Sequence, residues 1–232
     1  MILTMTILIC SDRDGTINED RNFYLGKETN WREQLEFLPG VIEGIRLLNI
    51  IPGAEFFIIT NQPYIAVSNP EFSQVTEKRI DEVNAEIVRK LKKEGLNIKG
   101  VFACTVADFA YRDKILARGW KYKPEYVVEN HRDLKPNIGM VERSAAVLGK
   151  SLKELDAIYV VGDRVSDVQT AINAGGKGVW VMSYKANEEK ERPKVEALKA
   201  KYPDRVFFAE DFMDAARMIC NDVKKMIPKE II

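Results

Sequence analysis

Short apolar segments alternate with helix-like segments along most of this 232-residue chain. The apolar segments are rich in Ile, Val and Phe, which is typical of strands buried on both faces of a sheet. They cover residues 6–11, 54–60, 101–105, 158–161 and 179–182, with a further short apolar run at 206–209. Helices are expected over 39–48, 69–95, 137–148, 166–174, 188–201 and 212–226. This alternation predicts a Rossmann-like, three-layer α/β/α fold around a mostly parallel sheet of about five or six strands.

The charges of the chain balance, with 35 Lys and Arg against 35 Asp and Glu. A neutral chain is poorly suited to non-specific binding of DNA or of an anionic membrane. The three cysteines form no CxxC pair, so neither a disulfide framework nor a four-cysteine zinc site is expected. The apolar first ten residues lack a basic segment, and we expect no signal peptide, no membrane partner and a cytoplasmic location. Without repeats or low-complexity linkers, residues 1–232 are expected to form a single domain.

Polar side chains follow three of the predicted strands at the point where each strand ends. These residues are Asp12, Asp14, Thr60, Asn61, Asp163 and Asp167. Each could simply make a turn, because Asp and Asn commonly do so. Parallel strands end at the same edge of a sheet, however, and crowded carboxylates repel unless a cation or proton shares the site. The set therefore predicts a Mg²⁺ site beside hydroxyl, amide and backbone N–H groups that suit phosphoryl oxygens.

Four motifs in the same order resemble the haloacid dehalogenase (HAD) superfamily of phosphotransferases. Residues 12–18, with the sequence DRDGTIN, are similar to its DxDGT signature, and residues 60–62 (TNQ) resemble its second motif. Lys135-Pro136 resembles the third motif and residues 162–167 (GDRVSD) the fourth. The DRDGTIN form is similar to the branch that holds histidinol-phosphate and heptose-bisphosphate phosphatases.

The resemblance implies an Mg²⁺-dependent phosphomonoesterase that acts through an aspartyl-phosphate. Asp12 would be the nucleophile, and Asp14 would be the general acid and then the general base. The phosphoryl oxygens would be held by Thr60, Asn61 and Lys135. The ligands of Mg²⁺ would be the Asp12 carboxylate, the Asp14 carbonyl and Asp163. Asp167 would be an additional ligand or a partner in the outer shell.

The chain departs from this branch in the regions that shape its substrate pocket. Members often carry a zinc loop of one His and three Cys, whereas this region holds only Cys104 and His131, so no zinc loop is expected. Leu134 stands where the branch often has Arg, and residues 61–68 lack the Gly and Arg common there. These changes leave the core reaction intact and leave the substrate open.

Residues 106–134 form the only sizeable insert, and too few residues separate the first two motifs for a large cap domain. We expect this insert to cover the active site. Its segment 109–124 carries a local net charge of +4, so it is either a solvated loop or an anion-binding wall. The aromatic residues within the insert would suit stacking on a base or a sugar ring; they include Tyr111, Trp120, Tyr122 and Tyr126.

The leading hypothesis is hydrolysis of a small phosphorylated metabolite. A polynucleotide 3′-phosphatase is an alternative, because the basic insert would suit a strand backbone, although the neutral net charge disfavours this partner. A non-catalytic phospho-ligand-binding or receiver-like protein also gathers Asp, Thr and Lys on a parallel sheet. A receiver has no use for the second acid, Asp14. A family member without physiological turnover is a further alternative.

Overall fold

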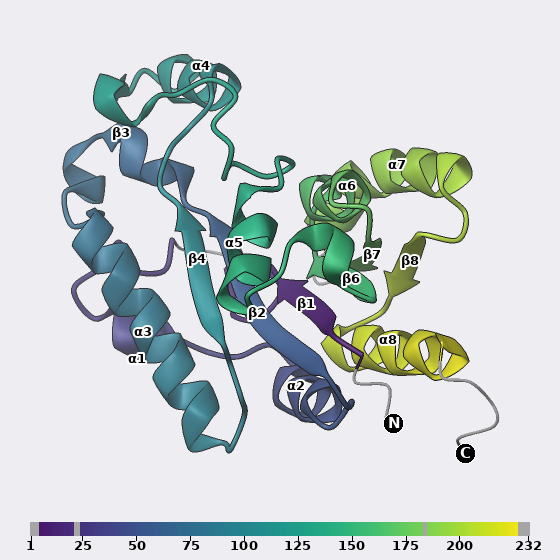
Figure 1. Cartoon of the computed structure of the whole chain (residues 1–232). Coiled ribbons are helices and arrows are strands. Elements are labelled where there is room, and N and C mark those ends of the chain that lie inside the picture. Colours follow the sequence, from purple (N-terminus) through teal and green to yellow (C-terminus); the bar gives the residue numbers. More distant parts are fainter. Residues whose placement is uncertain (1–4, 21–23, 183–184, 227–232) are drawn as a thin grey trace.

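A six-stranded parallel sheet forms the centre of the protein in the computed structural model, which describes residues 5–20, 24–182 and 185–226 (Figure 1). Its strands are β1 (Ile7–Ser11), β2 (Ala54–Asn61), β4 (Gly100–Cys104), β6 (Ala157–Gly162), β7 (Lys177–Val181) and β8 (Val206–Ala209). Their order is β4-β2-β1-β6-β7-β8, and every pairing is parallel. The predicted α/β fold with five or six strands is confirmed. The strand order reverses its direction between β1 and β6, which makes this pair the switch point of the sheet.

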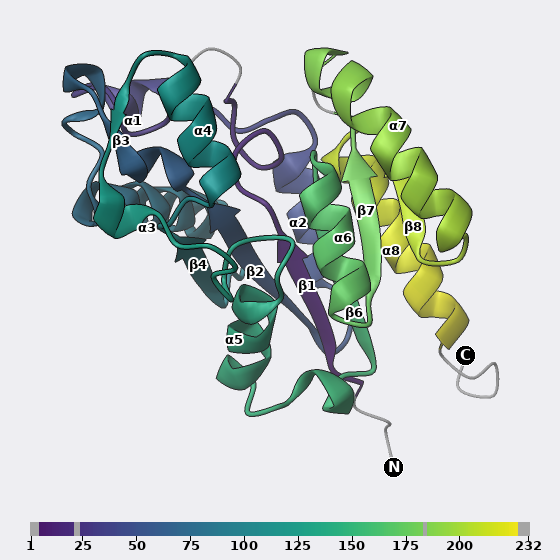
Figure 2. The ribbon, with the colours of Figure 1, turned by 90° about the horizontal axis from the view of Figure 1, so that it is seen from above.

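Helices cover both faces of the sheet (Figure 2). One layer contains α1 (Trp31–Gln34), α2 (Val41–Asn49), α3 (Glu77–Lys93) and α8 (Phe212–Met226), and the other contains α5 (Gly139–Val147), α6 (Val165–Asn173) and α7 (Lys185–Lys201). Successive residues of a strand face opposite layers. Ile7 and Ile9 of β1 pack on the first layer, and Leu8 and Cys10 on the second. Burial on both faces explains why the strands are apolar throughout.

A small lobe stands beyond the carboxyl ends of β2 and β4 (Figure 1). In it, β3 (Val67–Ser68) pairs antiparallel with β5 (Lys121–Tyr122), and α4 (Phe109–Ala117) contacts β5. The lobe has an apolar core of its own, to which both sequence segments contribute. The insert at 106–134 is therefore one half of this lobe, and the segment that follows β2 is the other half.

The long helix predicted over 69–95 begins later, at Glu77. Asn69 does cap a helical turn, because its side chain accepts a hydrogen bond from the Glu71 N–H, but this turn is a short 3₁₀ helix, η2 (Pro70–Phe72). Thr76 then caps α3 by accepting from the Arg79 N–H at 3.1 Å. The other 3₁₀ helices are η1 (Pro63–Ala66), η3 (Pro124–Tyr126) and η4 (Leu152–Glu154).

The helix α4 lies where the sequence shows no periodicity. Its apolar residues point in different directions, since Ile115 is buried whereas Phe109 and Leu116 are exposed. Asp108 caps it by accepting from the Tyr111 N–H at 2.7 Å. In the part of the chain that the structure describes, no helix is both long and apolar enough to cross a membrane.

Candidate active site

The predicted catalytic residues leave the sheet at its switch point. Asp12 directly follows β1, and its backbone N–H donates to the Val161 carbonyl of β6 at 2.8 Å. Asp163 directly follows β6. Ligands of open α/β sheets bind in the crevice outside such strand ends. The topology thus joins the first and fourth motifs, which are about 150 residues apart.

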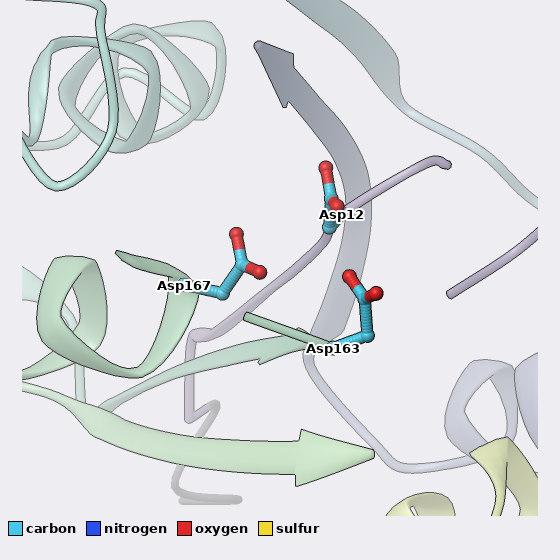
Figure 3. Close-up of side chains that lie close together, drawn as sticks. All are labelled: Asp12, Asp163 and Asp167. Atoms are coloured by element: carbon cyan, nitrogen blue, oxygen red, sulfur yellow. The ribbon is translucent and has the colours of Figure 1, made fainter. Parts of the chain in front are cut away.

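Three buried carboxylates, those of Asp12, Asp163 and Asp167, meet at this point (Figure 3). One oxygen from each lies within 4.8 Å of the others. The three residues are 6%, 1% and 0% exposed, and carboxylates so close and so buried need a compensating cation. A compact set of hard oxygen donors suits Mg²⁺, so these residues fit the ion that the sequence predicts. Asp167, which the resemblance gives as an additional Mg²⁺ ligand or a partner in the outer shell, lies in the same cluster as Asp12 and Asp163.

Two glycines allow the backbone to approach these acids closely. Gly15 has a φ of +79°, and a Cβ atom there would lie 2.7 Å from Oδ2 of Asp163. A Cβ atom on Gly162 would lie 2.3 Å from Cγ of Asp167. Both distances are far below van der Waals contact, so both glycines are needed for space, and the positive φ of Gly15 favours glycine there for turn geometry as well.

Lys135 supplies positive charge to the cluster. Its Nζ donates to Oδ1 of Asp12 and to Oδ1 of Asp167, both at 2.6 Å, and to the Ile59 carbonyl at 3.2 Å. Burial alone would lower the pKa of Lys135, but the two carboxylates outweigh it and hold that pKa above its ordinary value. The lysine is therefore charged, and it balances part of the negative charge of the cluster.

Burial raises the pKa of Asp12 to about 6, against the opposing effect of Lys135 and with a contribution from Asp167. In the absence of a further cation, the carboxyl group thus takes up a proton about two pH units above its ordinary value of 3.8. A cation bound between the three acids would favour the ionised form, which is the nucleophilic one.

The Asp14 carboxylate is held by a hydrogen-bond network. It accepts from Nε and Nη2 of Arg13 at 3.0 and 2.7 Å, from Nε2 of Gln62 at 2.7 Å and from Nδ2 of Asn18 at 3.1 Å. Burial alone would raise the pKa of Asp14, but the Arg13 charge and these hydrogen bonds hold it below its ordinary value. Coordination of a metal by the Asp14 carbonyl stays a prediction.

Thr60 and Asn61, at the end of β2, lie beside Lys135 in different ways. Thr60 is buried and lines the cavity described below. Asn61 holds the backbone of Lys135 in both directions: its Nδ2 donates to the Lys135 carbonyl at 3.2 Å, and its Oδ1 accepts from the Lys135 N–H at 3.1 Å. Its amide thus positions Lys135, and contact with a phosphoryl group stays a prediction.

A cavity of about 470 Å³ opens over these residues. Its floor includes Asp12, Asp14, Thr60, Asn61, Lys135 and Asp167. Its lining also carries four cations, Lys114 of α4, Arg118 directly after α4, Arg164 directly before α6, and Lys190 of α7. Figure 2 shows α4 on one side and α6 with α7 on the other. Tyr111 and Lys114 share one face of α4, since they are spaced at i and i+3, and the C-cap residue Arg118 continues that spacing at i+7.

The aromatic residues of the insert divide into two groups. Tyr111 lines the cavity together with Tyr24 from the loop after β1. Trp120, Tyr122 and Tyr126 do not line the cavity; like Tyr111 they pack against the apolar core of the lobe, where the Trp120 ring lies 5.6 Å from that of Phe72. Tyr111 is therefore the one of the four that lines the cavity, and stacking of these aromatic residues on a ligand stays a prediction.

Several residues of the site were not singled out from the sequence. Arg13 and Gln62 are fully buried beneath Asp14, although each lies inside a motif. Asp20 lines the cavity, and burial together with the Asp14 charge raises its pKa to about 8. Lys190 follows the last motif by more than 20 residues. It reaches the site because its neighbour Glu191, which is 6% exposed, accepts from the Val165 N–H of α6 at 3.0 Å.

Comparison with known proteins agrees with this geometry. Residues 135–214 match a family model described as HAD-hydrolase-like. A D-glycero-beta-D-manno-heptose-1,7-bisphosphate 7-phosphatase of Neisseria meningitidis is 24% identical over 78% of this chain and 80% of its own length. A protein of the same name from Escherichia coli K12 is 26% identical over 70% of this chain and 72% of its own length.

Solved structures show the same fold. A D,D-heptose 1,7-bisphosphate phosphatase from B. bronchiseptica, complexed with magnesium and phosphate, superposes with a TM-score of 0.65 at 20% identity, over 94% of this chain and 99% of that one. A putative HAD-like phosphatase from Mesorhizobium loti gives 0.58 at 24% identity, over 76% and 73%. With its four motifs assembled at the switch point of such a fold, the chain is similar to the HAD-like hydrolases in its motifs, in the family model matched by residues 135–214 and in its fold.

Proposed function

We propose that the protein is an Mg²⁺-dependent phosphomonoesterase that forms an aspartyl-phosphate on Asp12. The observation that carries this proposal is the position of Asp12. Its carboxylate lies at the floor of the cavity, 2.6 Å from the Lys135 ammonium and within the three-acid cluster. A second acid, Asp14, lines the same cavity two residues further on. A nucleophile, a cation site and an acid–base group are the parts that this chemistry requires.

In the first displacement, a carboxylate oxygen of Asp12 forms a bond to phosphorus while the bond from phosphorus to the ester oxygen breaks. Asp14 enters this step in its protonated form, although Arg13 and Gln62 favour its ionised form in the free protein, and it gives its proton to that oxygen as the alcohol leaves. In the second displacement, water attacks the phosphorus and gives a proton to Asp14. The bond between phosphorus and the Asp12 oxygen then breaks, which releases inorganic phosphate, restores the Asp12 carboxylate and leaves Asp14 protonated as at the start.

Asp12, Asp163 and Asp167 would hold Mg²⁺, and Lys135 would remain beside Asp12. When bound, the ion supplies positive charge between two groups that otherwise repel, the carboxylate nucleophile and the phosphoryl oxygens. The Lys135 ammonium and the Thr60 hydroxyl would bind the oxygens from the side of β2. Their burial excludes water, which strengthens each of these electrostatic contacts.

The substrate we propose is a small sugar-like phosphate with a second anionic group. The curated relatives are named for a heptose bisphosphate, and the cavity offers a second set of charges. Its four lining cations come from three parts of the fold, α4 with the residue after it, the residue before α6, and α7, so we expect some of them to bind a second anionic group. At about 470 Å³ the cavity falls in the range of small-molecule sites.

A panel of phosphates tests the activity and the substrate together. We expect hydrolysis that needs Mg²⁺, that is abolished by Asp12→Asn and that is unchanged by the exposed control Asp204→Asn. Lys114→Met and Arg118→Met should raise KM for a sugar bisphosphate by about tenfold each and leave a monophosphate unaffected, since a charged hydrogen bond contributes about 1.5 kcal/mol. The exposed control Lys92→Met should change neither.

The polynucleotide 3′-phosphatase alternative is favoured by the same four cations, because they would also suit a strand backbone. It predicts activity on 3′-phosphorylated oligonucleotides that falls steeply as salt concentration rises. Preference for such oligonucleotides over every sugar phosphate would replace the substrate proposed above. Turnover without Mg²⁺, or by Asp12→Asn at the wild-type rate, would overturn the mechanism itself.

A further inference from the structure

We propose that Gln62 is a positioning residue that links the acid–base group Asp14 to the phosphate-binding hydroxyl of Thr60. This role rests on the proposed function, in which both partners act on the substrate. Gln62 is fully buried at the end of β2, and all four of its side-chain hydrogen bonds are made within the site. Its amide is the only group that bonds to both Asp14 and Thr60 among the contacts of the described residues.

The orientation of the Gln62 amide follows from the groups on each side. On one side, Oε1 accepts from Nη2 of Arg13 at 2.9 Å and from the Tyr64 hydroxyl. On the other side, Nε2 donates to Oδ2 of Asp14 and to Oγ1 of Thr60, both at 2.7 Å. The opposite orientation would place an N–H₂ against a guanidinium and an oxygen against a carboxylate. Only one orientation therefore satisfies all the partners.

The Arg13 guanidinium fixes the orientation of the Gln62 amide by donating to its Oε1. It is fully buried, and besides Asp14 and Gln62 it donates from Nη1 to Oδ1 of Asn84 on α3 at 2.7 Å. The nearby Asp14 charge holds the pKa of Arg13 above its ordinary value, against the effect of burial. A charged donor with a fixed direction keeps Oε1 of Gln62 facing it, so Nε2 stays directed at the two site residues.

Each of the two bonds from Nε2 has a consequence for the reaction. Because Oγ1 of Thr60 accepts from Gln62, the hydroxyl hydrogen of Thr60 points away from Gln62. Thr60 lines the cavity, so this hydrogen is available to a phosphoryl oxygen there. The bond to Asp14 fixes the direction of its carboxylate, which must reach the ester oxygen of the same substrate. One amide thus sets the relative positions of the phosphoryl group and its proton donor.

The substitution Gln62→Glu separates this role from packing. It keeps the size of the side chain and an acceptor for Arg13 and Tyr64, but it removes the N–H groups that face Asp14 and Thr60. Gln74→Glu is the matched control, because Gln74 is exposed and lies between η2 and α3, outside the cavity lining. Gln62→Met removes all four hydrogen bonds at similar length and replaces Gln62→Glu if that variant does not fold.

Two readouts are measured in saturating Mg²⁺. The first is the ratio of kcat/KM for an alkyl phosphate to kcat/KM for a nitrophenyl phosphate, whose leaving group needs little protonation. We expect Gln62→Glu to lower this ratio by about 10- to 100-fold, since a misplaced Asp14 harms only the poor leaving group. The second is the affinity for inorganic phosphate by calorimetry, which we expect to weaken about tenfold through Thr60.

A uniform loss on both phosphate esters, or an unchanged phosphate affinity, overturns the role of Gln62. Gln74→Glu should match the wild type in both readouts. If the wild type hydrolyses neither ester, it is the proposed function that fails. The calorimetric comparison still decides in that case whether Gln62 orients the Thr60 hydroxyl, since phosphate binding requires no turnover.

Discussion

Replacing Lys135 by Met removes the cation that lies between Asp12 and Asp167. Each carboxylate then loses a partner at 2.6 Å while remaining buried, and Asp163 stays within 4.8 Å of both. Removal of one member of a buried ion pair typically destabilises a protein by about 3–5 kcal/mol, because the remaining charge is left uncompensated. We expect a loss of this size in the free energy of unfolding, measured by urea denaturation in EDTA.

Magnesium should restore a large part of that loss if the three acids form the cation site. Binding to the folded state alone stabilises it by about 2.7 kcal/mol at a hundred times the dissociation constant. The gain from Mg²⁺ should be larger in Lys135→Met than in wild type, since the variant has no ammonium to share the negative charge. Lys177→Met is the matched control, because Lys177 pairs with Asp222 at a partly exposed position far from the cluster.

The reasoning is refuted by either of two results. If Lys135→Met lowers the free energy of unfolding by less than about 1 kcal/mol, the value typical of an exposed ion pair, the buried cluster is not under electrostatic strain. If Mg²⁺ stabilises Lys135→Met and Lys177→Met equally, the ion does not bind at the carboxylates that Lys135 contacts.

Three further predictions concern neighbouring groups. The pKa of Asp12 in the folded state is about 6, above its ordinary value of 3.8, so protonated Asp12 favours folding below pH 4 and this effect is lost as pH rises through 6. In EDTA, the free energy of unfolding of the wild type relative to Asp12→Asn should therefore fall by about 1–3 kcal/mol between pH 4 and pH 6. A difference that does not change with pH would contradict the raised pKa. Gly15→Ala should weaken the stabilisation by Mg²⁺, measured by thermal unfolding, because the added Cβ would lie too close to Asp163. The control Gly119→Ala, also at positive φ but with open space around it, should lower the free energy of unfolding by only about 1 kcal/mol and keep the stabilisation by Mg²⁺. Asn61→Ala and Asn49→Ala each remove two hydrogen bonds to one backbone residue, so both should lower the free energy of unfolding in urea by about 1–2 kcal/mol. Only Asn61→Ala should also lose phosphatase activity. Equal activity of the two variants would show that the Lys135 backbone does not need the Asn61 side chain.

The sheet and the floor of the site could be predicted because their signals are local. Apolar runs ending in Asp12 and Asp163 indicate parallel strands, and parallel strands place their ends together regardless of the loops between them. Lys135 could be found only through its motif, since nothing nearby in sequence shows that it reaches β1. The cap at Thr76 was missed because Asn69-Pro70 is an equally good local signal and begins a 3₁₀ turn instead.

The missed parts depend on contacts between distant segments. A fully buried arginine cannot be predicted from residue type, and Arg13 is stable there only because Asp14, Gln62 and Asn84 together satisfy it. The lobe is a second case, since its two halves lie on either side of α3 and β4 in the sequence. Each half has too few apolar residues to show a pattern, and the shared core forms only when they pack together.

Chemical trapping of the phosphorylated enzyme tests the central claim most directly. The protein is mixed with substrate and Mg²⁺, quenched in acid within the first turnover, digested and analysed by mass spectrometry. The mechanism predicts a phosphoryl group on the peptide that contains Asp12, stable in acid and removed by hydroxylamine, and absent from Asp12→Asn. Sustained hydrolysis by the wild type with no phosphoryl group on Asp12 at any quench time, together with turnover by Asp12→Asn, would contradict it.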